Sequence, residues 1–80
     1  MRTEEEILKL FSDSVREVDS NIKLKDLTAQ TEIAQLGLDS VMTMEVIGAM
    51  EEKLNVRFPD EDLATLKSMS DLTALIRRLE

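Results

Sequence analysis

The chain has 80 residues, and its ten Lys and Arg residues against 17 Asp and Glu residues give a formal net charge of −7 at pH 7. It contains no Cys and no His, which excludes a disulfide scaffold, a Cys/His zinc site, a thiol nucleophile and any catalytic dyad built on His. A net negative chain is repelled by phosphate backbones and anionic lipid headgroups, so we expect a protein with a basic surface as partner, and neither nucleic acid nor membrane.

The first predicted helix covers about residues 3–17. Thr3 and Glu6 have the spacing of a capping box, in which two side chains satisfy free backbone amides at a helix start. Apolar residues then recur at three- and four-residue intervals, which predicts one buried stripe. The stripe consists of Ile7, Leu8, Phe11, Val15 and Val18.

A connection of about twenty residues follows, from Asp19 to Leu38. It is much longer than the roughly 2 to 8 residues usual between bundle helices, and long loops tend to be functional. Four apolar residues are spaced as anchors that would hold an ordered loop against the helices: Leu24, Leu27, Ile33 and Leu36.

The second helix is expected to begin after Asp39, a good N-cap residue, and to run to about Leu54. Its periodicity gives two faces. One face, expected in the core, holds Thr43, Val46, Ile47, Met50 and Leu54, and the opposite face holds Val41, Glu45, Gly48, Ala49 and Glu52.

Two further helical segments follow Pro59, which cannot lie in a helix interior. The acidic residues 60–62 predict a short turn carrying Leu63 and Leu66, and the last helix is expected to start at Ser68, with Asp71 in the reciprocal capping position. Its core stripe would be Leu72, Leu75, Ile76 and Leu79. No segment shows the alternation of apolar and polar residues that would predict a strand in place of these helices. We therefore expect an all-α bundle of three main helices and one short helix, with a long loop between the first two, in a single domain spanning residues 1–80.

Sequence motifs exclude most kinds of active site. A Ser/His/Asp triad is impossible without His, and the chain has only two glycines, Gly37 and Gly48, in no phosphate-binding motif. The acidic run 60–62 lacks the alternation and the glycine of a calcium-binding loop. We expect no catalytic residues and no resident metal site.

The segment Leu36-Gly37-Leu38-Asp39-Ser40-Val41 lies where the long loop meets the second helix. Gly37 permits a positive φ, Asp39 caps the helix, and Ser40 is presented at the helix N-terminus, where a covalently attached phosphate would be stabilised. From these features alone, Ser40 is either a modification site or one half of an ordinary capping pair.

This segment resembles the attachment motif of acyl and peptidyl carrier proteins. The resemblance extends to further residues at matching spacings: Thr43, Glu45, Val46, Glu51, Glu52, Pro59, Asp60 and the Ser68-Met69 pair. It implies that a phosphopantetheinyl transferase (a holo-carrier synthase) uses coenzyme A and Mg²⁺ to attach 4'-phosphopantetheine to Ser40, with Asp39 helping to position the metal. The arm would supply the thiol for acyl thioesters, and the chain itself would not be an enzyme.

The resemblance also implies a recognition face that docks onto basic patches of acyl-transferring and acyl-modifying enzymes. Glu45 and Glu52 would supply its charge, and Val41 and Met44 its apolar contacts. The alternative is an ordinary solvated helix face, and both interpretations stay open for Glu51 and for the acidic run 60–62. Gly48 costs about 1 kcal/mol relative to Ala in a helix interior, which suggests close approach of a partner there.

The cargo is less well defined. Met42 stands where fatty-acid carriers often have an acidic residue, and in this respect the sequence is closer to polyketide carriers. In contrast, Glu51-Glu52 and Pro59-Asp60-Glu61 look more like free-standing fatty-acid carriers. We expect a specialised, discrete, monomeric carrier of fatty-acid, lipid or polyketide intermediates. The alternatives are amino-acyl or peptidyl cargo, or an unmodified acidic adaptor. The polar start of the chain and the absence of a long apolar run predict a cytoplasmic location without membrane insertion.

Overall fold

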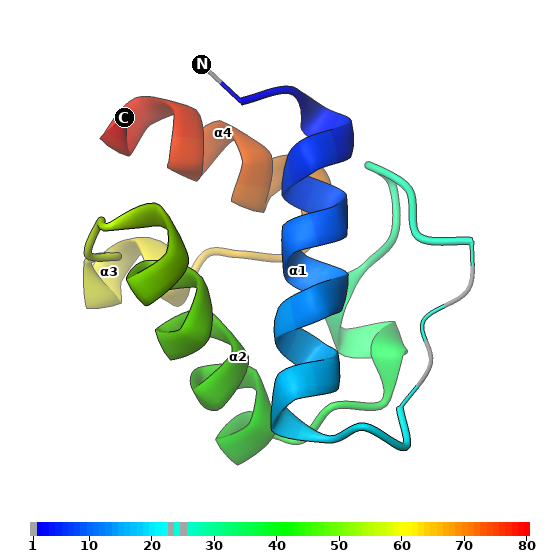
Figure 1. The fold of residues 1–80 in the computed structure, drawn as a ribbon. Coiled ribbons are helices and arrows are strands. Elements are labelled where there is room, and N and C mark those ends of the chain that lie inside the picture. Colours follow the sequence, from blue (N-terminus) through cyan, green and yellow to red (C-terminus); the bar gives the residue numbers. More distant parts are fainter. Residues whose placement is uncertain (1, 23, 25) are drawn as a thin grey trace.

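A computed structural model describes residues 2–22, 24 and 26–80. Within these ranges the chain is helical and has no strand (Figure 1). The elements are α1 (Glu4–Val18), the 3-10 helix η1 (Ile33–Leu36), α2 (Ser40–Leu54), α3 (Asp60–Leu63) and α4 (Met69–Leu79). The predicted bundle of three main helices and one short helix is confirmed, and the main helix boundaries agree to within about one residue.

The first and last helices begin at the two predicted capping boxes. The Thr3 hydroxyl accepts from the Glu6 amide at 3.2 Å, and the Glu6 carboxylate accepts from the Thr3 amide at 3.0 Å. At α4 the Ser68 hydroxyl accepts from the Asp71 amide at 3.3 Å, and the Asp71 carboxylate accepts from the Ser68 amide at 3.1 Å. These amide hydrogen bonds favour the ionised carboxylates and so lower the pKa of both Glu6 and Asp71.

The core lies between α1, α2 and α4. Its buried apolar residues are Ile7, Phe11, Val15, Val46, Ile47, Met50, Leu54, Phe58, Met69, Leu72, Leu75 and Ile76. Most of the predicted stripe residues are among them, and Leu8, Val18 and Leu79 pack against this core while partly buried. Thr43 differs from the prediction, because it is only half-buried at the start of α2, where its hydroxyl donates to the Asp39 carbonyl at 2.9 Å.

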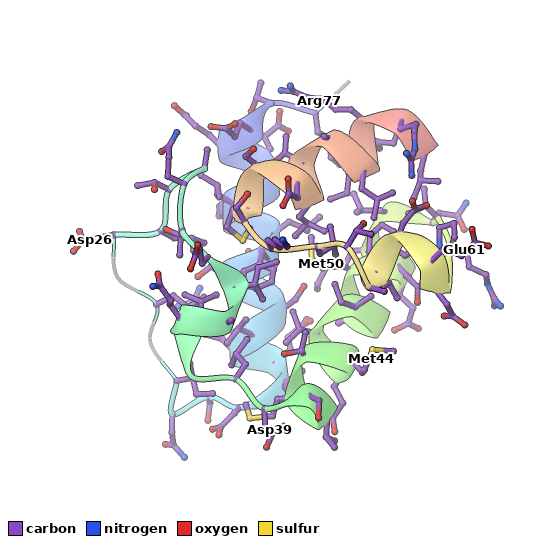
Figure 2. All side chains as sticks on the ribbon, turned by 180° about the vertical axis from the view of Figure 1, so that it is seen from behind. Asp26, Asp39, Met44, Met50, Glu61 and Arg77 are labelled. Carbon is purple, nitrogen blue, oxygen red and sulfur yellow. The ribbon has the colours of Figure 1, made fainter. Side chains whose placement is uncertain are left out.

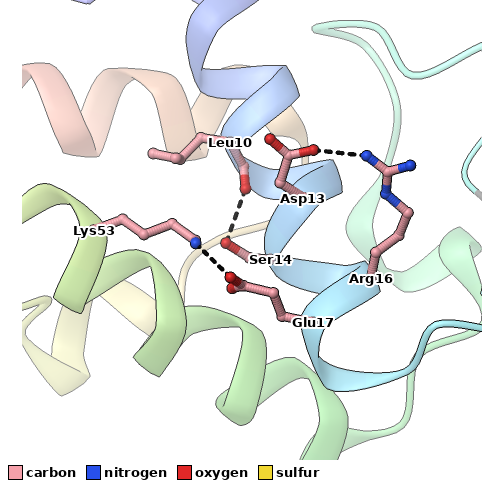
Figure 3. Close-up of polar contacts among 6 residues, drawn as sticks. All are labelled: Leu10, Asp13, Ser14, Arg16, Glu17 and Lys53. Carbon is pink, nitrogen blue, oxygen red and sulfur yellow. Dashed lines mark hydrogen bonds and ion pairs between the residues drawn. The ribbon is translucent and has the colours of Figure 1, made fainter.

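Polar contacts lie both within α1 and between α1 and α2 (Figure 3). Lys53 of α2 and Glu17 of α1 form an ion pair at 2.8 Å. Ser14 is fully buried on α1, and its hydroxyl donates to the Leu10 carbonyl one turn earlier at 2.8 Å. This bond removes the cost of burying an unpaired hydroxyl, whereas the exposed ion pair adds at most about 1 kcal/mol.

The described residues of the long connection between α1 and α2 lie beside α1 (Figure 1). The 3-10 helix η1, which forms within this connection, was not predicted from the sequence. Backbone hydrogen bonds to the segment before α4 stabilise it: the Ile33 amide donates to the Lys67 carbonyl at 2.8 Å, and the Met69 amide donates to the Thr31 carbonyl at 2.9 Å. All four predicted anchors, Leu24, Leu27, Ile33 and Leu36, pack against the core. The connection is therefore pinned to the segment that leads into α4.

None of the helices in the described ranges is both long enough and apolar enough to cross a membrane.

Candidate functional site

The candidate site is built on the turn that leads into α2. Gly37 adopts a left-handed conformation with φ of 79°, which glycine accepts without steric cost. Two residues later, the Asp39 carboxylate accepts from the Met42 amide at 2.7 Å, and the Asp39 carbonyl accepts from the Thr43 amide at 2.9 Å. The predicted N-cap is thus confirmed, and it fixes the position at which α2 begins (Figure 2).

Ser40 is the first residue of α2, and its side chain is exposed to solvent. The first turn of α2 contains no acidic residue, whereas that of α1 contains three. Free amides and the helix dipole at such an end favour an anion. A phosphate attached to the Ser40 hydroxyl would therefore lie at a helix end that favours an anion, where the only acidic group in the N-cap and first-turn positions is the Asp39 carboxylate, which caps the Met42 amide.

An open groove of about 490 Å³ begins beside Ser40. It is lined by residues from the long connection, from α2 and from the segment before α4: Glu32, Ile33, Ala34, Leu38, Ser40, Thr43, Met44, Leu66 and Lys67. Most of these side chains are apolar, so the groove fits a flexible and largely uncharged chain anchored at Ser40. The residues present therefore fit the phosphopantetheine arm implied by the resemblance.

Sequence reasoning did not predict this groove, because its two walls are far apart along the chain. Residues 32–34 and 66–67 meet there through the Ile33–Lys67 hydrogen bond. The apolar anchors in the long connection were the only signal, and they indicated burial without naming the partner segment.

The four predicted recognition residues all lie on the solvent-facing side of α2. Val41 is 66% exposed and Met44 is 56% exposed, high values for large apolar side chains. Glu45 and Glu52 are also exposed. Since they are seven residues apart, they lie about 10 Å apart along the helix axis. The exposed surface of α2 is thus apolar near Ser40 and acidic further along the helix.

The other acidic residues of this region divide into two kinds. The half-buried Glu51 carboxylate accepts from the Phe58 amide at 2.7 Å, and so holds the segment that leaves α2. Asp62 pairs with Arg78 of α4 at 2.7 Å. Asp60 and Glu61 are exposed. Glu51 and Asp62, whose roles the sequence left undecided, therefore make contacts within the fold.

Three or more acidic side chains do not converge anywhere in residues 2–22, 24 and 26–80 in a way that could hold a metal ion. Asp39, which was expected to help position a metal during modification, uses one carboxylate oxygen for its capping bond.

Comparison with known proteins places these features in a family. Residues 7–76 match the family model described as the phosphopantetheine attachment site. The chain is 34% identical over 79 residues to the meromycolate extension acyl carrier protein of Mycobacterium tuberculosis, covering 98% of this chain and 68% of that protein. It is 35% identical over 79 residues to an acyl carrier protein of Rhodococcus erythropolis, covering 98% of this chain and 86% of that protein.

Proposed function

Since the chain belongs to the phosphopantetheine-attachment family and is an acyl carrier protein, we propose that Ser40 is the residue that carries its 4'-phosphopantetheine group. Proteins of this family are carriers rather than catalysts. The arm supplies the thiol to which an acyl group is bound as a thioester, and this chain has no Cys of its own. The observation that carries the proposal is the exposed Ser40 side chain at the first position of α2, beside an apolar groove.

The residues around Ser40 would act by positioning. Asp39 holds the start of α2 through its bond to the Met42 amide, so the Ser40 hydroxyl is presented outward from a fixed turn. Free amides of the first turn stabilise the phosphate after attachment. We propose that the carboxylate of Asp39 also helps a phosphopantetheinyl transferase to hold Mg²⁺ during the transfer from coenzyme A.

The outer side of α2 is the proposed docking surface for that transferase and for acyl-transferring and acyl-modifying enzymes. Val41 and Met44 supply apolar contact area, and Glu45 and Glu52 attract basic side chains of the partner. This arrangement brings a partner's active site to Ser40 while its charged contacts form further along the helix. All chemical steps on the cargo would be performed by these partners.

We propose an acyl intermediate of lipid synthesis as cargo. The apolar lining of the groove beside Ser40 favours an acyl chain over an amino-acyl or peptidyl group. The relative from Mycobacterium tuberculosis is named for meromycolate extension, so an acyl chain undergoing extension is the specific class that we propose to test first.

The experiment is intact-mass measurement after incubation with coenzyme A, Mg²⁺ and a broad-specificity phosphopantetheinyl transferase, with Ser40→Ala as the matched control. We expect wild type to gain one phosphopantetheine group and the variant to gain none. A folded wild-type sample that gains nothing with transferases of two different classes would contradict the proposal and favour an unmodified adaptor.

A further inference from the structure

Lys67 is the one basic residue among those that line the groove beside Ser40. Apart from Glu32 of the long connection, the other lining side chains are apolar or carry a hydroxyl. In the described part of the chain, the Lys67 ammonium forms no ion pair. The positive charge in this groove therefore has no counter-ion within the described residues.

The backbone of Lys67 is fixed on both sides. Its carbonyl accepts from the Ile33 amide at 2.8 Å, and its amide donates to the Asp71 carboxylate at 3.1 Å. Because both bonds use backbone atoms, the exposed side chain remains available for a contact in the groove. The fold thus anchors the base of this side chain and leaves its charged end to other partners.

Lys67 and Ser40 belong to different parts of the groove. Figure 2 shows the segment that leads into α4 crossing the middle of the molecule, whereas Asp39 lies at its lower end. Of the groups in a phosphopantetheine arm, the phosphate is bound directly to Ser40, the thiol is at the far end, and the chain between them is uncharged. The thiol is therefore the ionisable group of the arm that can move along the groove to Lys67.

We propose that Lys67 binds the terminal sulfur of the arm and stabilises its thiolate. This inference rests on the proposed function. An ordinary thiol has a pKa of about 8.5, and a neighbouring lysine lowers it. The apolar walls of the groove strengthen this attraction, because they exclude part of the water that would otherwise screen it. Lys67 thereby favours loss of the thiol proton to water, and the thiolate is the form that acts as a nucleophile.

Two carboxylates near Lys67 oppose this effect. Glu32 lines the same groove, and the Asp71 carboxylate lies at the Lys67 amide. The described residues that α2 contributes to the groove add no charge, since they are Ser40, Thr43 and Met44. The sign of the shift in the thiol pKa therefore depends on the ammonium of Lys67 alone.

The test measures the rate of alkylation by iodoacetamide as a function of pH, in the protein that carries the arm. The chain has no Cys, so the arm holds its only thiol, and intact mass counts the one group added. Since the thiolate is the reacting form, the midpoint of the pH profile reports the thiol pKa. Wild type is expected to have a lower midpoint than Lys67→Met. The difference should correspond to about threefold more thiolate near neutral pH, the size of a modest exposed charge pair.

Three variants separate a contact in the groove from a general effect of charge. Lys67→Arg keeps the positive charge and should keep the low midpoint. Lys9→Met removes a charge from an exposed position of α1 outside the groove and should leave the midpoint unchanged. Glu32→Gln removes an opposing charge and should lower the midpoint further. Added salt is expected to reduce the difference between wild type and Lys67→Met.

Equal midpoints for wild type and Lys67→Met would overturn the inference, and so would an equal shift in Lys9→Met. Either result would leave Ser40 as the attachment site. A wild-type chain that gains no phosphopantetheine would overturn the proposed function, and the inference with it.

Discussion

Substitution of Asp39 separates its two roles, capping α2 and assisting modification. The carboxylate accepts from the Met42 amide at 2.7 Å, a short, charge-assisted hydrogen bond at an exposed helix start. Asp39→Ala removes that acceptor, whereas Asp39→Asn keeps an acceptor oxygen in the same place and removes only the charge. The two variants therefore differ in capping and share the loss of the carboxylate.

The expected magnitudes follow from capping energetics. Asp39→Ala should cost about 1 kcal/mol, which lowers the melting temperature of a chain of this size by about 4–8 °C. Asp39→Asn should cost no more than about 0.5 kcal/mol, because Asn caps nearly as well and only the attraction between the carboxylate and the helix dipole is lost. Thermal unfolding followed by circular dichroism measures both values.

Modification assays on the same variants test the second role. If the carboxylate helps to position Mg²⁺, Asp39→Asn remains folded and yet is modified at Ser40 more slowly than wild type. Equal destabilisation by Asn and Ala would refute the capping argument. Modification of Asp39→Asn at the wild-type rate would refute the role in metal positioning and leave Asp39 as a cap alone.

Three further predictions concern the remaining carboxylates. Glu51→Ala should destabilise the fold by about 1.5–3 kcal/mol in chemical unfolding, because the Phe58 amide loses its charged acceptor; Glu51→Gln, which can still accept, should cost less, and equal costs would contradict this reading. Two backbone amides at the start of α4 hold the pKa of Asp71 below its ordinary value of 3.8. The contribution of the ionised Asp71 carboxylate to the stability of the fold is therefore complete above pH 3.8 and is lost as the pH falls through the folded-state pKa. The stability advantage of wild type over Asp71→Asn should therefore vanish on acidification, and an advantage independent of pH would argue against it. Charge reversal at Glu45 and Glu52 should impair Ser40 modification while helical circular dichroism is kept, and wild-type turnover in that variant would exclude these residues from docking.

The parts of the fold that depend on local chemistry could be predicted from the sequence. The capping pairs Thr3/Glu6 and Ser68/Asp71 satisfy amides three residues away, so their spacing alone located the starts of α1 and α4. Asp39 likewise located the start of α2. The position of Ser40 at a helix N-terminus therefore follows from local sequence alone.

The parts that depend on distant contacts could not be predicted. The 3-10 helix η1 and the groove beside Ser40 exist because residues 31–33 hydrogen-bond to residues 67–69, and no local periodicity encodes that pairing. Met69 is fully buried although it directly follows the Ser68 cap and lies outside the predicted stripe of α4. The fixed position of Glu51 was hidden for the same reason, since its acceptor role depends on how the chain turns back at Phe58.

The central claim, that Ser40 carries the phosphopantetheine arm, is tested most directly by locating the added group in the modified protein. Cleavage after Lys25 and Lys53 releases a peptide, residues 26–53, in which Ser40 is the only serine. Tandem mass spectrometry of that peptide should place one phosphopantetheine group on Ser40. Localisation to a threonine of the same peptide, or to a serine elsewhere in the chain, would contradict the account.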